Sequence, residues 1–200
     1  LLLALALVAI LYLVIYFTNP LVFKDPKRYY YLLTIFLLAS AVTFICEKTV
    51  PHLKYIIPYP VFALYLLAFF RKRLGMPFYM VLLLHLLIFC GNGMELFVMY
   101  LVAGTVTLET FGYFSKGWRQ FLNAAIIFGV EALIFLAFRL IDVGSNSAWW
   151  MDVILIFIGS VATVALYPLI YLFEKIFNLV SVTRLIELAD TSNPLLQELS

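Results

Sequence analysis

Seven long apolar runs follow one another along this chain of 200 residues and leave few folds open to it. A helix that crosses the hydrocarbon core of a bilayer needs about 20 predominantly apolar residues, with a range of roughly 17–25. Short connections between the runs favour antiparallel neighbours. The sequence therefore predicts an all-α polytopic membrane protein, a seven-transmembrane-helix bundle. The predicted spans cover residues 1–17, 29–46, 53–70, 75–89, 95–114, 121–141 and 151–173.

Composition excludes a water-soluble domain and several catalytic classes. Hydrophobic residues make up 66% of the chain and charged residues only 12%, whereas an average soluble domain has about 25% charged residues. The net charge of +2 is too small for a nucleic-acid surface. Two cysteines and two histidines form no disulfide framework and no metal-binding motif. Phosphate-binding, dinucleotide-binding, zinc-protease and nucleophile-elbow motifs are also missing from the sequence, so we expect no catalytic residue, cofactor or metal site in this chain.

The placement of Lys and Arg predicts the orientation of the bundle. If the N-terminus lies outside, the segments 18–28, 71–76 and 115–119 and the tail after Phe173 lie inside and hold ten Lys and Arg, against two in the outside loops. Cytoplasmic segments of membrane proteins carry the excess of Lys and Arg. We therefore expect an outside N-terminus and a cytoplasmic C-terminus. Tyr31, Tyr59 and other aromatic residues at the predicted span ends are interpreted as interfacial anchors.

The fourth and fifth runs leave one alternative open. They either form two full spans or dip into the membrane and return as a re-entrant hairpin through Gly91-Asn92-Gly93. Both arrangements leave the flanking segments on the same side, so the charge count does not separate them. Two spans are favoured because each run is near the required length.

Polar residues within the predicted spans are the candidate site. An ionised group at the centre of a span costs about 2.5–3.5 kcal/mol on insertion scales, so such residues usually face the interior and find partners. We expect Glu131 to face inward with His85 as its partner. The candidate intramembrane residues are His85, Glu109, Asn123, Glu131 and Arg139.

The other expected partners lie closer to the span ends. Arg139 is expected to extend to the outer interface near Asp142, and Glu109 to meet Lys116 or Arg119. Three interpretations stay open for the polar residues: a hydrogen-bonded cluster that fixes helix packing, which is favoured, a pocket that binds a ligand or transmits a signal, or simple interfacial exposure.

The tail after Phe173 carries a family resemblance. Residues 168–177, 183–188 and 193–196 resemble the junction between the membrane and cytoplasmic parts of bacterial seven-transmembrane HD-domain receptors, the PgpH-type cyclic-di-AMP phosphodiesterases. Ser192-Asn193 departs from the Asn-His that many members have before the proline. The residues of this signal-linker motif are Glu174, Thr183, Arg184, Glu187, Asp190 and Pro194.

The resemblance implies a longer receptor in the bacterial cytoplasmic (inner) membrane. Residues 1–173 would be its transmembrane domain, and residues 174–200 a cytoplasmic helical linker to an HD phosphohydrolase domain that this chain lacks. The first run begins without Met or a basic segment, which we interpret as a fragment boundary that follows an extracellular sensor domain. In the family, His and Asp residues of the HD domain hold two metal ions that activate water for phosphodiester hydrolysis. None of those ligands is present here, so the fragment itself is expected not to be an enzyme.

Three functions follow from these observations. The first is a sensing and signal-transducing domain that couples the extracellular domain to the HD-type cyclic-dinucleotide phosphodiesterase. The second is a passive membrane anchor for that enzyme, and the third, less favoured, is a small transporter or channel, for which we find no repeat between halves. The expected partners are the lipid bilayer and the two flanking domains of the same polypeptide, with homo-oligomerisation open and nucleic acid excluded.

The orientation is testable by cysteine labelling in intact cells. In a background without Cys46 and Cys90, a cysteine at position 144 should react with a membrane-impermeant maleimide, and one at position 117 should not. The reverse labelling pattern would overturn the orientation.

Overall fold

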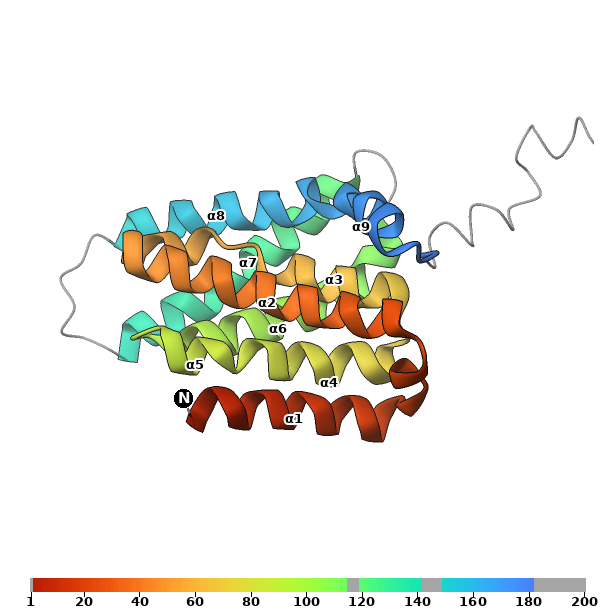
Figure 1. Cartoon of the computed structure of the whole chain (residues 1–200). Coiled ribbons are helices and arrows are strands. Elements are labelled where there is room, and N and C mark those ends of the chain that lie inside the picture. Colours follow the sequence, from red (N-terminus) through yellow and green to blue (C-terminus); the bar gives the residue numbers. More distant parts are fainter. Residues whose placement is uncertain (1, 115–118, 142–148, 182–200) are drawn as a thin grey trace, which may run out of the picture.

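The computed structural model describes residues 2–114, 119–141 and 149–181, and every regular element in these residues is helical. Seven segments run side by side along the bundle (Figure 1): α1, α2, η2 with α3, α4 with α5, α6, α7, and α8 with α9. They correspond to the seven predicted runs, so the predicted fold class is confirmed. The elements are α1 (Leu2–Thr18), η1 (Pro20–Lys24), α2 (Pro26–Thr49), η2 (Pro51–Ile56), α3 (Tyr59–Phe69), α4 (Lys72–Leu83), α5 (His85–Phe89), α6 (Gly93–Phe114), α7 (Arg119–Ile141), α8 (Trp149–Ala165), η3 (Tyr167–Leu169) and α9 (Ile170–Phe177).

Length and hydropathy mark four helical stretches of the described chain as able to cross a membrane, Pro26–Thr49, His52–Phe69, Lys72–Phe89 and Gln120–Ile141. The α8–α9 pair adds a fifth if it counts as one span, with a bend of 42° between its two parts. The bend lies within the run predicted for residues 151–173, where Pro168 interrupts the helical hydrogen bonding. The chain is a multi-pass membrane protein.

The lengths of α4–α5 and α6 bear on the hairpin alternative. The α4–α5 segment is one of the four candidate spans. Helix α6 has 22 residues, which corresponds to about 33 Å at a rise of 1.5 Å per residue. Each is long enough to cross the hydrocarbon core, which favours two spans over a shallow hairpin.

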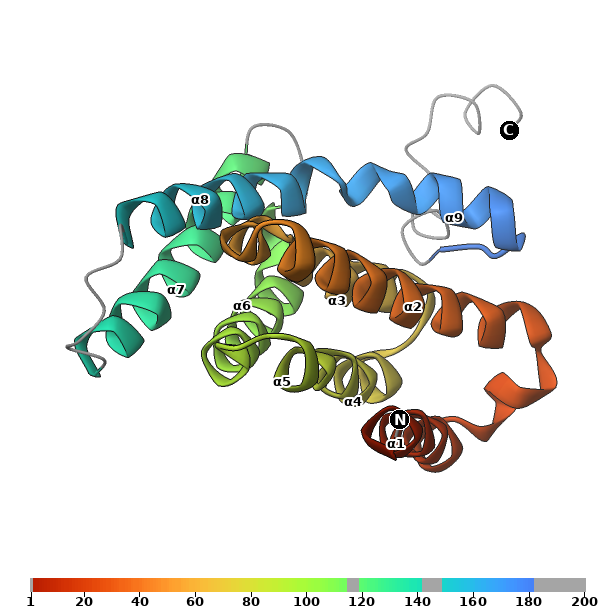
Figure 2. The ribbon, with the colours of Figure 1, turned by 60° about the vertical axis from the view of Figure 1, so that its left-hand side comes forward.

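Helix α3 forms the centre of the bundle. It contacts α2, α4, α6 and α8, and Figure 2 shows it enclosed by these helices. Its residues are buried from Tyr59 to Leu66 without interruption, as expected for a helix that is apolar on all faces. Pro60 in its first turn fits a helix start, where a missing N–H costs nothing.

Helix α1 lies at the edge of the bundle. It packs mainly on α4 (Figure 2), through a narrow stripe formed by Leu7, Leu11 and Ile15. The stripe has the spacing of one helix face. Most of its other described large apolar side chains are exposed, as expected for a helix that faces lipid.

Several tyrosines that the sequence predicts at the membrane interface are buried in the core instead. Tyr31 and Tyr59 have no exposed surface. The Tyr31 hydroxyl donates to the Tyr65 carbonyl (2.7 Å), and the Tyr65 hydroxyl donates to the Leu166 carbonyl at the α8 bend (2.6 Å). A buried tyrosine keeps its ring in the core when its hydroxyl finds an acceptor. Trp149 and Trp150 are exposed, as interfacial anchors should be.

Close packing of α8 against η2 gives a test of the fold. A Cβ added at Gly159 would lie 2.9 Å from the Ile56 carbonyl oxygen, a backbone atom that cannot rotate away. We expect Gly159→Ala to lower the free energy of unfolding by about 1–3 kcal/mol, measured by thermal unfolding in detergent. Gly129→Ala on α7 is the matched control, because nothing lies within 4 Å of its added Cβ, and it should stay within about 1 kcal/mol of wild type. Equal effects of the two substitutions would contradict this packing.

Candidate functional site

The five predicted intramembrane residues do not form one cluster. His85 lies 2.7 Å from the Thr43 hydroxyl through Nε2, and Thr43 also hydrogen bonds with the Tyr59 hydroxyl. Glu131 instead accepts a hydrogen bond from Ser160 of α8 (2.7 Å). The expected His85–Glu131 pair is therefore wrong: each residue finds a hydroxyl partner on another helix, Thr43 of α2 for His85 and Ser160 of α8 for Glu131. The inward orientation of Glu131 is confirmed, since only 2% of the residue is exposed.

Two further candidates lie toward the end of the bundle that carries α9. Asn123 is buried and accepts a hydrogen bond from Thr110 of α6 (2.7 Å). Glu109 forms an ion pair with Lys72 of α4 (2.7 Å), and 64% of its side chain is exposed. The expected partners, Lys116 and the Arg119 side chain, lie outside the described part of the chain, and the observed partner comes from a helix that is distant in sequence.

Arg139 reaches a buried acid that the sequence analysis did not name. Its Nη2 lies 3.4 Å from Oδ2 of Asp152, which is buried in the first turn of α8. The predicted neighbour Asp142 lies outside the described residues. The guanidinium also covers the Phe135 ring, 4.8 Å from its centroid, a cation–π geometry that stabilises a partly desolvated Arg.

Asp152 and Arg139 belong to a larger polar group, which we call the end cluster. Asp152 Oδ1 accepts from His52 Nδ1 (2.8 Å), and Arg139 Nη2 also donates to the Tyr55 hydroxyl (3.4 Å). Tyr55 in turn donates to Glu95 Oε1 (3.0 Å). The end cluster consists of His52, Tyr55, Asn92, Glu95, Arg139 and Asp152.

The end cluster joins four parts of the chain at the end of the bundle opposite α9 (Figure 1). η2, the start of α6, the end of α7 and the start of α8 each contribute to it. Of its members, the sequence analysis named only Arg139 as a candidate site residue. The signal that points to the others is that acids and bases fall near the ends of several spans on one predicted side, where antiparallel neighbours bring them together.

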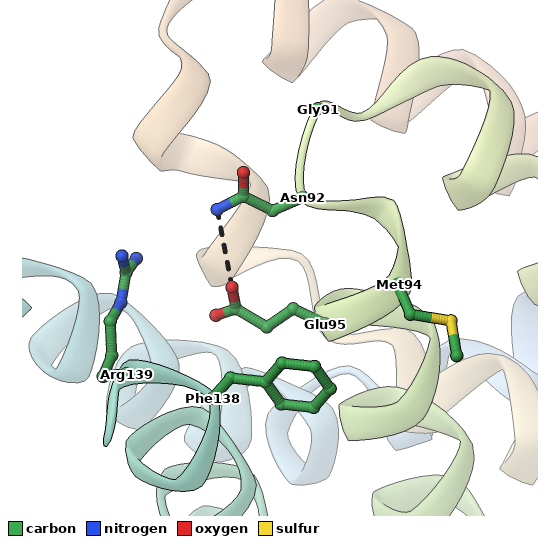
Figure 3. A pocket seen from close by; sticks show the side chains of 6 residues that line it. All are labelled: Gly91, Asn92, Met94, Glu95, Phe138 and Arg139. Atoms are coloured by element: carbon green, nitrogen blue, oxygen red, sulfur yellow. Dashed lines mark hydrogen bonds between the residues drawn. The ribbon is translucent and has the colours of Figure 1, made fainter. Parts of the chain in front are cut away.

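A cavity of about 190 Å³ opens beside the end cluster. Figure 3 shows Asn92 and Glu95 on one side and Arg139 on the other, with Phe138 and Met94 completing the wall. Asn92 Nδ2 donates to Glu95 Oε2 (3.4 Å). The cavity therefore has a carboxylate on one side, a guanidinium on the other, and apolar side chains in the rest of its lining. Within the described ranges, no group of three or more His, Cys, Asp or Glu is placed to hold a metal ion.

The α9 end of the bundle holds the first residue of the predicted linker motif. Glu174 is buried, and its Oε1 accepts from the backbone N–H of Ser181 (2.8 Å). Asn178 ends α9 in the left-handed conformation, with φ of 50°. The remaining motif residues, Thr183, Arg184, Glu187, Asp190 and Pro194, lie outside the described residues.

Comparison with known proteins gives one match. The sequence model of the family described as "7TM receptor with intracellular HD hydrolase" matches residues 1–181. No curated protein and no solved structure matches the chain.

The Arg139–Asp152 pair predicts a large effect of removing one charge. Asp152→Asn leaves the Arg139 guanidinium without this buried counter-charge and should lower the free energy of unfolding by about 3 kcal/mol. Glu109→Gln is the control, because its ion pair with Lys72 is exposed and should contribute less than about 1 kcal/mol. Both variants are compared with wild type by thermal unfolding in detergent. A wild-type melting temperature for Asp152→Asn would contradict a stabilising role for the pair.

Proposed function

The chain belongs to the family of seven-transmembrane receptors with an intracellular HD hydrolase, and we propose that it is the sensing and signal-transducing membrane domain of such a receptor. In the complete protein it couples an extracellular domain to a cytoplasmic, metal-dependent HD phosphodiesterase that hydrolyses a cyclic dinucleotide, with cyclic-di-AMP as the expected substrate. The family description names an intracellular hydrolase. This supports a cytoplasmic position for the α9 end of the bundle and, at the opposite end, an outer position for the end cluster.

The observation that carries this proposal is the attachment of the α8–α9 segment to the centre of the bundle. This segment leads toward the linker. Its bend is held by the Tyr65 hydroxyl, which donates to the Leu166 carbonyl (2.6 Å). The same carbonyl accepts the Leu169 N–H (3.0 Å). A displacement of α3 therefore also moves the Leu166 carbonyl at the bend.

A second attachment lies beyond the bend. The Tyr31 ring packs edge-on against Phe173 and Phe177 of α9, with centroids 5.7 and 5.4 Å apart. The Tyr31 hydroxyl donates to Tyr65, so α2, α3 and α9 are joined through two tyrosines. Buried aromatic pairs of this kind contribute about 0.5–1.5 kcal/mol each beyond their buried area. Rigid joints of this kind are what transmission of motion from the bundle to the linker requires.

The proposal is tested in the complete natural protein, reconstituted in nanodiscs, by its rate of cyclic-di-AMP hydrolysis. Tyr65→Phe removes only the hydroxyl that holds the bend, and we expect the rate to change by about fivefold or more in either direction. The bundle should still fold, because one hydrogen bond contributes about 1 kcal/mol. Tyr171→Phe is the matched control, since Tyr171 is exposed on α9, and it should leave the rate unchanged.

Two outcomes would overturn the proposal in different ways. A wild-type rate for Tyr65→Phe, together with a wild-type rate when the whole bundle is replaced by an unrelated membrane anchor, would reduce the domain to a passive anchor. Failure of the complete wild-type protein to hydrolyse any cyclic dinucleotide would remove the enzymatic part.

A further inference from the structure

We propose that the cavity beside the end cluster binds a small zwitterion, a free α-amino acid with a short apolar side chain. The inference rests on the proposed receptor function only in naming the class of signal that such a receptor would sense. It is carried by the arrangement of charge, the size and the lining of the cavity.

Glu95 supplies the site for the ammonium group. The residue is 8% exposed and lines the cavity. Its carboxylate accepts from two neutral donors, the Tyr55 hydroxyl (3.0 Å) and the Asn92 amide (3.4 Å). Within the part of the chain that the structure describes, Glu95 forms no ion pair. A buried carboxylate is stabilised by a positive charge in direct contact, which a ligand ammonium in the cavity provides.

Arg139 supplies the site for the carboxylate. Its guanidinium lies on the other side of the cavity (Figure 3). The Tyr55 hydroxyl bridges the two residues: it accepts a hydrogen bond from Arg139 and donates one to Glu95. A guanidinium has five donors in a planar fork, a geometry that recognises carboxylates through charge-assisted hydrogen bonds. An ammonium and a carboxylate separated by one carbon atom fit these two adjacent sites.

The size of the cavity restricts the rest of the ligand. A volume of about 190 Å³ is below the roughly 300–1,000 Å³ of pockets that hold drug-sized ligands, which favours a small ligand. Phe138 and Met94 offer apolar contact to a short aliphatic side chain. The opposite charges of Glu95 and Arg139 also disfavour a simple anion or cation, since each would meet one repulsive wall.

The test measures binding to the complete natural protein in nanodiscs, in a buffer without amines or carboxylates. Each of the twenty L-amino acids is added, and the transition of the bundle is followed by thermal unfolding. We expect at least one small apolar amino acid, with L-valine as the first probe, to raise the melting temperature saturably by about 2 °C or more. Isobutylamine and isovalerate, which each keep one charged group of valine, should give less than half of that shift.

Variants locate the site. Glu95→Gln should weaken binding by about tenfold or more, and Met94→Trp should abolish it by filling the cavity. Met94 is largely exposed, so this substitution leaves the fold intact even if Glu95→Gln does not fold. Glu109→Gln, a remote carboxylate, should bind as wild type does.

The outcomes separate this inference from the proposed function. The absence of a shift with every amino acid, an equal shift in Met94→Trp, or a full shift with isobutylamine or isovalerate alone would overturn the zwitterion site. Binding without any change in hydrolysis would leave the site in place and count against coupling. A changed hydrolysis rate in Tyr65→Phe, together with no binding of any amino acid to the wild-type protein, would support the proposed function and overturn the zwitterion site.

Discussion

The need to pair every polar group in an apolar interior governs this structure. In a bilayer no water reaches the core, so each helix break leaves carbonyl and amide groups that the protein itself must satisfy. The bundle contains such a break at the Pro168 bend, and a tyrosine hydroxyl from the central helix α3 donates to the Leu166 carbonyl there. Tyr100 of α6 does the same for the Lys54 carbonyl in η2, at 3.1 Å. Buried tyrosine hydroxyls thus lie where the backbone is irregular. Helix α3 carries one of them, Tyr65, and its central position brings this hydroxyl to the bend.

The same requirement explains why charge is distributed so unevenly. Two buried polar groups of mid-bundle have neutral partners: Glu131 is paired with Ser160 and His85 with Thr43. Arg139 and Asp152, which form a buried ion pair, lie instead where the helices end. Ions are costly at the centre of a span and less so near the interface. The end cluster therefore sits at a depth that tolerates charges and still excludes most solvent, the setting in which a ligand's own charges are recognised strongly.

How much of this could be predicted from the sequence depends on whether a property is local. Apolar runs and their stops are local, so the seven segments were predicted, but the third was expected as one span over residues 53–70 and is divided into η2 and α3. The inward orientation of Glu131 was also predicted, but orientation does not say which helices are neighbours, and the His85 pairing failed for that reason. The Arg139–Asp152 pair was not predicted, because it forms between two helices, α7 and α8, whose packing the sequence does not show. Tyr31 and Tyr59 were assigned to the interface because they lie at predicted span ends, whereas their hydrogen-bond partners, the Tyr65 carbonyl and the Thr43 hydroxyl, lie on other helices.

The hydrogen bond between Tyr65 and Leu166 joins residues that are 101 positions apart. During synthesis α3 is therefore made long before its acceptor leaves the ribosome. Until then the hydroxyl of Tyr65 lacks this acceptor. Of the four helices that surround α3 in the finished bundle, α2 is made before it, and α4, α6 and α8 are made after it. The bundle cannot mature by adding finished spans one after another. Its innermost helix has to wait at the edge, beside the insertion machinery or in lipid, and is enclosed only when the last segment arrives.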